Sequence, residues 1–225
     1  MGGVRSGARQ PNWFSDRLEV ATIRQISVST PINFFDTDVV TSDMRRWLER
    51  AVIGLNLCPF AKSVHVKGQV HYVVSGATTP QALREELRRE LLALRATAPE
   101  ERDTTLLMAP RCLQEFLDFN DFLDEADAVV AELGLAGELQ IASFHPQFQF
   151  AGTAPDDISN YTNRAPYPTL HLLREASIDR AVEAFPQAET IFEKNMQTLE
   201  ELGHEGWSAL DLGPSSRVDK KDPHS

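Results

Sequence analysis

One chemical signal in the sequence is Cys58, which directly precedes Pro59 in the segment GLNLCPFAK at residues 54–62. Proline favours the first turn of a helix, so this order predicts a thiol at a helix N-terminus. The helix dipole there lowers the pKa of a cysteine and favours a nucleophilic thiolate. We therefore take Cys58 as a candidate catalytic nucleophile. A small buried thiol that serves only packing would carry the same pattern.

The second signal is a long connection at residues 145–168, which is rich in both aromatic and polar side chains. Connections of this length are usually functional or disordered, and large aromatic groups favour burial over disorder. His145 at its start is the candidate general acid/base. Amide and guanidinium groups suit the oxygens of an anion, and the candidate ligand-binding residues are Arg111, Asn160, Asn163, Arg164, His171 and Arg174. A loop held by its own hydrogen bonds would need similar residues.

Other chemistries are open to the same residues. A cysteine-dependent hydrolase is one, because a cysteine, a histidine and an amide follow in the chain order of papain-like proteases, namely Cys58, His145 and Asn160. The sequence around the cysteine lacks the signature of that family. A metal-dependent hydrolase is another, with ligands drawn from His145, His171 and Asp156 or Asp157. A non-catalytic module that docks a protein partner through the aromatic loop is the third.

Alternating strand and helix patterns must position these residues. Short apolar, β-branched runs predict strands, and apolar residues at helical spacing predict the helices between them. Thr41/Ser42 and Ser177 are expected helix caps, and Thr79 with Pro80 is a further helix start. We expect strands at 70–75, 104–109, 139–144 and 170–173, and helices at 42–55, 80–94, 113–133, 177–185 and 191–203.

The order strand–helix–strand–helix–strand predicts an α/β domain with helices packed on a small, mostly parallel sheet. A ferredoxin-like α+β arrangement is the alternative. Because the carboxyl ends of parallel strands share one edge, where ligands bind in open α/β sheets, we expect a common site there: Ser75, Gly76, Arg111, Cys112 and His145.

The expected domain covers residues 41–212. A poorly ordered N-terminal extension at 1–40 precedes it, and a flexible C-terminal tail at 213–225 follows it. The true start codon is not fixed by these patterns.

The composition narrows the class of partner. The chain of 225 residues has a formal net charge of −11, which disfavours binding to nucleic acids and to anionic membranes. Its two cysteines form no CxxC motif, so the chain is expected to be cytoplasmic with reduced thiols. We expect an enzyme or sensor for a small anionic metabolite with a pocket under residues 145–168. The sequence names no cofactor and leaves the oligomeric state open.

Three long segments also resemble a known family. WLERAVIGLNLCPFAK, FHPQFQF and NYTNRAPYPTLHLLRE are similar to segments of the bacterial family of unknown function DUF1415. The resemblance runs from about Arg45 to about Leu202. It implies no activity, cofactor or catalytic residue, but it suggests that the three segments form one functional unit.

Overall fold

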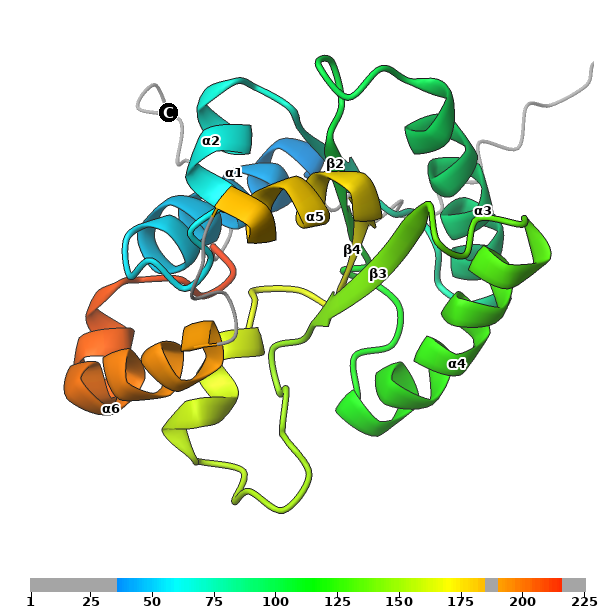
Figure 1. Cartoon of the computed structure of the whole chain (residues 1–225). Coiled ribbons are helices and arrows are strands. Elements are labelled where there is room, and N and C mark those ends of the chain that lie inside the picture. The colour runs from blue at the N-terminus through cyan, green and yellow to red at the C-terminus, as the bar shows by residue number, and fades with distance from the viewer. Residues whose placement is uncertain (1–35, 185–189, 216–225) are drawn as a thin grey trace, which may run out of the picture. The chain divides into compact units, whose positions relative to one another are not determined.

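The computed structural model describes residues 36–184 and 190–215. Figure 1 shows helices on both faces of a central sheet. The described chain begins with α1 (Thr37–Trp47) and continues without a break into the π-helical segment η1 (Leu48–Ile53). Most of the predicted extension at 1–40, and residues 216–225 of the predicted tail, lie outside the described residues.

The remaining elements follow the predicted alternation of strands and helices. The strands are β1 (Val70–Val74), β2 (Thr104–Met108), β3 (Leu139–Phe144) and β4 (Thr169–Arg174). The helices are α2 (Ala61–Val66), α3 (Pro80–Ala96), α4 (Phe116–Glu132), the 3-10 helix η2 (Ile158–Asn163), α5 (Glu175–Ala184) and α6 (Ile191–Ala209). None of the helices in the described ranges is both long enough and apolar enough to span a membrane.

The sheet has the order β1-β2-β4-β3. Strands β1 and β2 are parallel, whereas β4 is antiparallel to both β2 and β3. Strands β1, β2 and β3 therefore point in the same direction, as predicted, and their carboxyl ends share one edge. The α/β class is confirmed, but the sheet is mixed rather than mostly parallel. The physical reason is that the loop after β3 returns the chain along the sheet, so that β4 fills the gap between β2 and β3.

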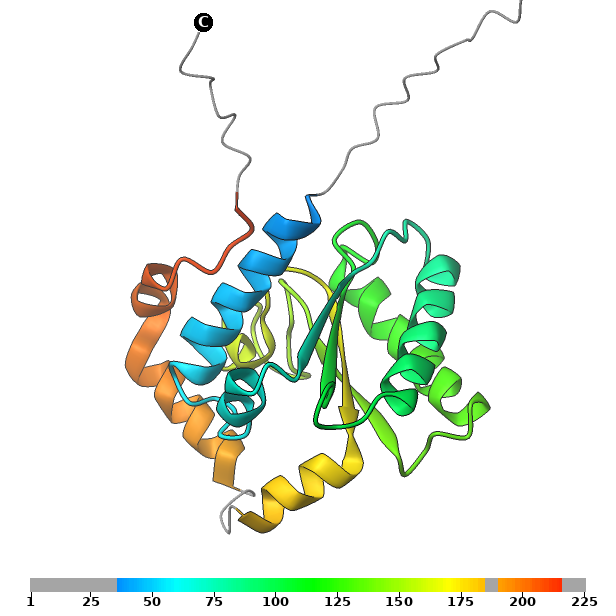
Figure 2. The same cartoon turned by 90° about the horizontal axis from the view of Figure 1, so that it is seen from above.

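Alternate residues of each strand face two separate apolar clusters. On one face, α3 and α4 pack against residues such as Leu107 and Leu172. On the other face, α1 and η1 pack against residues such as Leu106 and Met108. Figure 2 shows the sheet edge-on between these two layers. We call them the α3/α4 face and the α1 face.

Local sequence explains most helix ends. The Thr79 side chain accepts a hydrogen bond from the Ala82 N–H at the start of α3, with Pro80 in the first turn, as predicted. Two predicted caps are wrong. α1 begins at an Asp36 cap, before Thr41/Ser42. Ser177 lies inside α5, where its hydroxyl donates to Asp103 instead of capping the helix.

The turn that carries Cys58 depends on a glycine. η1 ends at Ile53, and the N–H of the following Gly54 donates to the Glu49 carbonyl oxygen five residues back. A Cβ at Gly54 would lie 2.3 Å from the Arg50 carbonyl oxygen, so only glycine fits this wide turn without a shift of the backbone. π-helical segments of this kind are frequent near functional sites. The chain then turns through Cys58 and Pro59 into α2.

Candidate functional site

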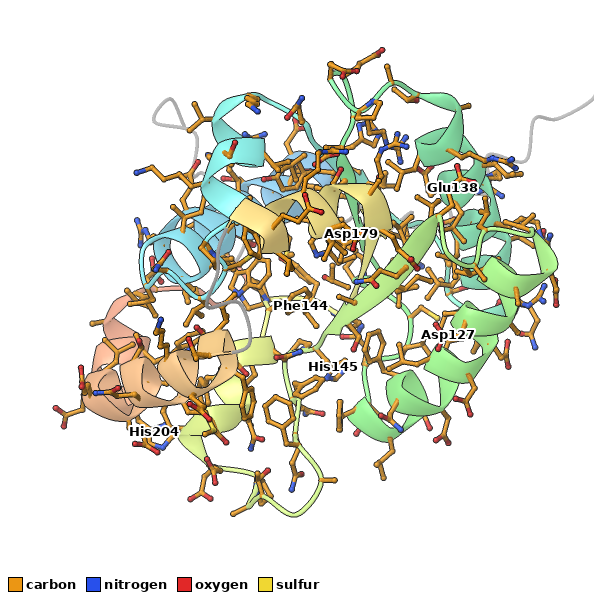
Figure 3. The ribbon with its side chains drawn as sticks, in the orientation of Figure 1. Asp127, Glu138, Phe144, His145, Asp179 and His204 are labelled. Atoms are coloured by element: carbon orange, nitrogen blue, oxygen red, sulfur yellow. The ribbon has the colours of Figure 1, made fainter. Side chains whose placement is uncertain are left out.

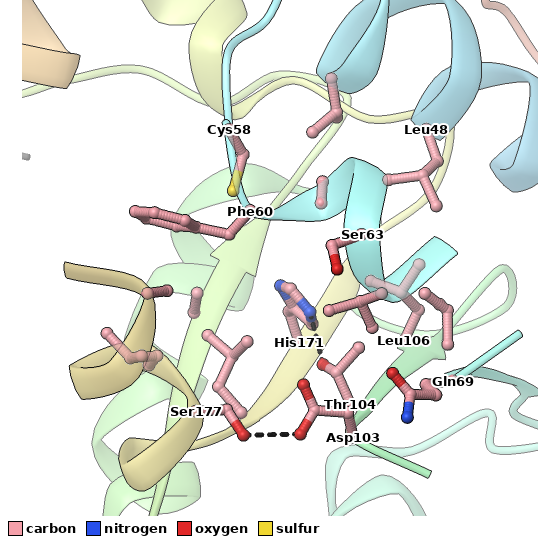
Figure 4. A pocket seen from close by; sticks show the side chains of 18 of the residues that line it. Leu48, Cys58, Phe60, Ser63, Gln69, Asp103, Thr104, Leu106, His171 and Ser177 are labelled. Carbon is pink, nitrogen blue, oxygen red and sulfur yellow. Dashed lines mark hydrogen bonds between the residues drawn. The ribbon is translucent and has the colours of Figure 1, made fainter. Parts of the chain in front are cut away.

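A pocket lies on the α1 face of the sheet (Figure 4). Side chains from α1, η1, α2, α5 and all four strands line it, and its volume is about 830 Å³. Pockets of this size hold small organic molecules. Cys58, from the turn before α2, and His171, from β4, both line it. We therefore name it the Cys58–His171 pocket.

Most of the lining is apolar. Aromatic and aliphatic side chains supply it, including Trp47, Leu48, Val52, Phe60, Leu106 and Phe144. The rings of Trp47 and Phe144 meet edge to face with centroids 5.1 Å apart. The Trp47 indole N–H donates to the Arg164 carbonyl oxygen at 2.8 Å. Because its one polar atom is paired, the indole presents an apolar wall that is fixed before any ligand binds.

Charged side chains in the lining balance one another. The lining includes two cations and two carboxylates, namely Lys67, Arg180, Glu100 and Asp103. All but Asp103 are exposed, and Asp103 accepts a hydrogen bond from the Ser177 hydroxyl at 2.6 Å. The pocket therefore offers no excess of positive charge that would attract an anion.

Cys58 is half-buried in the lining of this pocket. Burial raises the pKa of its thiol, although hydrogen bonds from the Phe60 and Ala61 backbone lower it in part. α2 begins at Ala61 and has only six residues, so its dipole is short. The predicted position near a helix N-terminus is correct, but desolvation outweighs the helix and keeps the thiol protonated.

His171 is held in one tautomer by its neighbour. The Thr104 hydroxyl donates its single proton to the Leu172 carbonyl oxygen at 2.7 Å. It also lies 2.7 Å from His171 Nε2, so it must accept a proton from that nitrogen. Nδ1 therefore carries a lone pair. Burial lowers the pKa of His171 to about 4, so the ring is neutral at pH 7.

His145 lies elsewhere. Its ring is fully buried and contacts the rings of Phe116 and Phe119 on the α3/α4 face. Nδ1 accepts from the Gln147 N–H at 3.0 Å, and Nε2 lies 3.1 Å from the Leu113 carbonyl oxygen. Burial lowers the pKa of His145. Both ring nitrogens are thus occupied by backbone groups.

The structure does not bring Cys58 and His145 together. Figure 3 labels His145 beside Phe144 at the end of β3. Phe144 packs on the α1 face, against which Cys58 also packs, whereas His145 contacts α4 on the opposite face. The candidate nucleophile shares its pocket with His171 instead.

The predicted anion-binding residues of the loop contact the loop itself and the end of β3. Asn160 is fully buried and accepts from the Phe150 N–H at 2.9 Å, while its amide donates to the Ala154 carbonyl. The Asn163 amide donates to the Ser143 carbonyl oxygen at 3.3 Å. The Arg164 guanidinium lies over the Tyr161 ring and donates to backbone carbonyls of the loop at Phe148 and Pro155.

The remaining candidates are spread over the fold. Arg174 donates to the carbonyls of Leu94 and Thr97 at the end of α3, where a cation is favourable. Arg111 is exposed near the carboxyl end of β2. Cys112 is buried in the α3/α4 cluster, and burial raises its pKa. Of the predicted ligand-binding residues, only His171 lines the Cys58–His171 pocket.

The described part of the chain offers no candidate metal site. No group of three His, Cys, Asp or Glu side chains is placed to hold a metal ion there. His171 lines the pocket on the α1 face, while His145 contacts α4 on the other face. The pair therefore cannot act as the common ligands that the metal-dependent alternative requires.

The sequence did not indicate the walls of the pocket. Trp47 and Phe144 look like ordinary core residues at helix and strand spacing, and Ser63 lies in α2, a short helix that the pattern does not reveal. Thr104 was the one available signal. It is a polar residue at the start of a strand buried along its whole length, and such a group needs a specific partner.

Fold and site together define an α/β protein with a mixed four-stranded sheet and an apolar pocket on one sheet face. The chain belongs to the family described as "protein of unknown function (DUF1415)", whose model matches residues 39–209. The predicted family is thereby confirmed. Neither the curated proteins nor the solved structures that were compared give a match.

Proposed function

We propose that the protein binds a largely apolar small molecule in the Cys58–His171 pocket. The observation that carries this proposal is a preformed cavity of about 830 Å³ with an apolar lining and a small number of polar atoms. Ligand sites in proteins commonly have this composition. An ordinary core would instead be filled by side chains.

The proposal keeps the small-molecule class expected from the sequence but changes the site and the charge of the ligand. The donors expected to hold an anion, those of Asn160, Asn163 and Arg164, instead contact backbone carbonyls of the loop and of β3. The pocket lies on a sheet face rather than under residues 145–168. Its charged lining residues balance, so apolar contact supplies the affinity.

Binding fits the pocket better than nucleophilic catalysis. The raised pKa of Cys58 leaves little thiolate at pH 7. His171 offers a neutral ring whose pKa is about 4, so it is a weak base for activating that thiol. The thiol is accordingly assigned to the wall of the pocket rather than to a reaction.

A filled-pocket variant tests the proposal. Ala142→Trp, on β3, places a large ring into the pocket, which Ala142 lines. Gln140→Trp is the matched control, because Gln140 lies on the same strand and face but is exposed and outside the lining. We expect neutral apolar probes such as 2-naphthol to raise the melting temperature of the wild type and of the control, since a ligand that binds the native state stabilises it.

The filled variant should show no such increase. Equal increases in all three proteins would place the binding site elsewhere. The proposal would be contradicted if none of the neutral apolar probes raised the melting temperature of the wild type.

A further inference from the structure

We infer that the Cys58–His171 pocket selects neutral molecules that donate a hydrogen bond, such as alcohols, phenols or amides, over carboxylates of the same size. The inference rests on the proposed function and names the class of ligand for the same pocket. It is carried by one atom, His171 Nδ1, and by the apolar surface around it.

The geometry leaves Nδ1 as an open acceptor. Thr104 occupies Nε2 and fixes the proton there. Nδ1 has no hydrogen-bond partner among the described residues. In those residues, the Tyr72 hydroxyl is the one buried side-chain polar atom that lacks a partner, so Nδ1 is not fully buried. It is therefore accessible from the pocket. Figure 4 shows the second ring nitrogen of His171 directed away from Thr104, toward the side where Cys58 and Phe60 lie.

An acceptor of this kind distinguishes ligands by chemistry. A neutral imidazole nitrogen with a lone pair can pair only with a donor. A hydroxyl or amide N–H supplies one, whereas an ionised carboxylate has acceptors alone. A carboxylate placed against Nδ1 would lose its hydration without gaining a hydrogen bond, which is costly in an apolar pocket.

The rest of the lining does not reverse this preference. The cations Lys67 and Arg180 are exposed, and the two carboxylates Glu100 and Asp103 equal them in number. The Ser63 hydroxyl both donates and accepts, so it does not separate the two classes. The apolar walls hold the body of the ligand, and Nδ1 decides the orientation of its polar end.

Three probes with one ring system test the inference by titration calorimetry on the full chain. 2-Naphthol donates a hydrogen bond, 2-methoxynaphthalene has the same ring without the donor, and 2-naphthoate is the carboxylate. We expect 2-naphthol to bind at least about fivefold more tightly than the methyl ether, in keeping with one hydrogen bond. 2-Naphthoate should bind more weakly than both.

The variant His171→Leu assigns the effect to the ring. It keeps the pocket apolar and removes the acceptor, so 2-naphthol and its methyl ether should then bind equally. The comparison of the three probes on the wild type stands even if this variant does not fold.

The outcomes separate the two proposals. Binding of 2-naphthol and its methyl ether with equal affinity to the wild type would overturn the inference and leave the proposed function intact. Tighter binding of 2-naphthoate, or a naphthol preference that survives in His171→Leu, would overturn it as well. Binding of none of the three would overturn both.

Discussion

The two candidate histidines differ in whether a ring nitrogen remains available to bind a ligand. His145 uses both ring nitrogens in contacts with backbone groups, so it holds the loop after β3 in place. His171 uses one nitrogen and leaves the other facing a pocket. The sequence named both residues as candidates. It could not separate them, because hydrogen-bond partners such as Leu113 and Thr104 are distant along the chain.

The lowered pKa of His171 predicts a loss of stability in mildly acidic solution. The folded ring titrates at about 4, whereas an unfolded histidine titrates near ~6.5. Between these values the unfolded chain binds the additional proton, so the free energy of unfolding falls by at most about 1.4 kcal/mol per pH unit as the pH decreases. Burial is the cause of the shift, although charged residues line the same pocket: Lys67, Glu100, Asp103 and Arg180.

Urea denaturation at several pH values from about 7 to about 4.5 measures this slope. His171→Phe should have a shallower slope than the wild type. A residual slope is expected in both, because burial also lowers the pKa values of His145 and His71. Identical slopes in the two proteins would contradict the assignment to His171.

The Asn160 side chain holds the loop after β3 in place, so removing it should destabilise that loop. Its buried side chain accepts from the Phe150 N–H and the Thr153 hydroxyl and donates to the Ala154 carbonyl. Asn160→Ala leaves these groups unpaired and should lower the free energy of unfolding by about 2 kcal/mol. It should also speed proteolysis within residues 145–168.

The control Asp156→Ala, at an exposed position of the same loop, should change the free energy of unfolding by less than about 0.5 kcal/mol. Equal effects of the two changes would refute this role.

The length of the helices that cover each face of the sheet decides which face carries the pocket. The α3/α4 face is closed by two long helices, whereas the α1 face is covered by α1, η1 and the short α2. The wide turn of η1 places Leu48 and Val52 in the wall and directs the chain into Cys58. Such a turn needs a residue without a side chain at Gly54.

The variant Gly54→Ala tests the role of this turn. Its Cβ would lie 2.3 Å from the Arg50 carbonyl oxygen, so we expect the free energy of unfolding to fall by about 1 to 3 kcal/mol. Binding of 2-naphthol should weaken as well, because the wall of the pocket shifts. Gly76→Ala is the control, since a Cβ there meets nothing within 4 Å. The explanation fails if the two variants have the same stability and affinity.

For the whole molecule, local patterns predicted the strands and the shared direction of the first three. Those features depend on the spacing of apolar residues and on local helix-start signals, such as Thr79-Pro80 before α3. The insertion of β4 between β2 and β3 was not predictable, because it depends on the path of residues 145–168 in space. The pocket was missed for a similar reason. Cys58 and His171 were both candidates, but they meet only because α1 and η1 pack across the sheet face.

The two ends of the described chain are joined by a buried carboxylate. Asp43 accepts hydrogen bonds from Arg46, the Tyr167 hydroxyl and both the N–H and hydroxyl of Ser215. Burial raises its pKa, but these hydrogen bonds and the Arg46 charge lower it by more, so the net shift is downward. The carboxylate therefore stabilises the fold at neutral pH and loses that contribution only in strong acid.

Asp43→Ala should lower the free energy of unfolding by about 3 kcal/mol, because it leaves buried donors without an acceptor. Asp38→Ala, at an exposed position in the first turn of α1, should cost less than about 1 kcal/mol. Chemical denaturation at pH 7 compares the two. A cost for Asp43→Ala no larger than that of the control would show that the network does not join the chain ends.

Protection of Cys58 from alkylation tests the central claim, that the pocket takes an apolar ligand, most directly. Cys58 lines the pocket, whereas Cys112 is buried on the other face of the sheet and serves as an internal control. Iodoacetamide at about pH 8 and peptide mass analysis give the rate at each thiol. We predict that saturating 2-naphthol slows the modification of Cys58 by at least about tenfold, while the rate at Cys112 reports how far the ligand suppresses opening of the fold. An unchanged rate at Cys58 in the presence of saturating 2-naphthol would contradict the account.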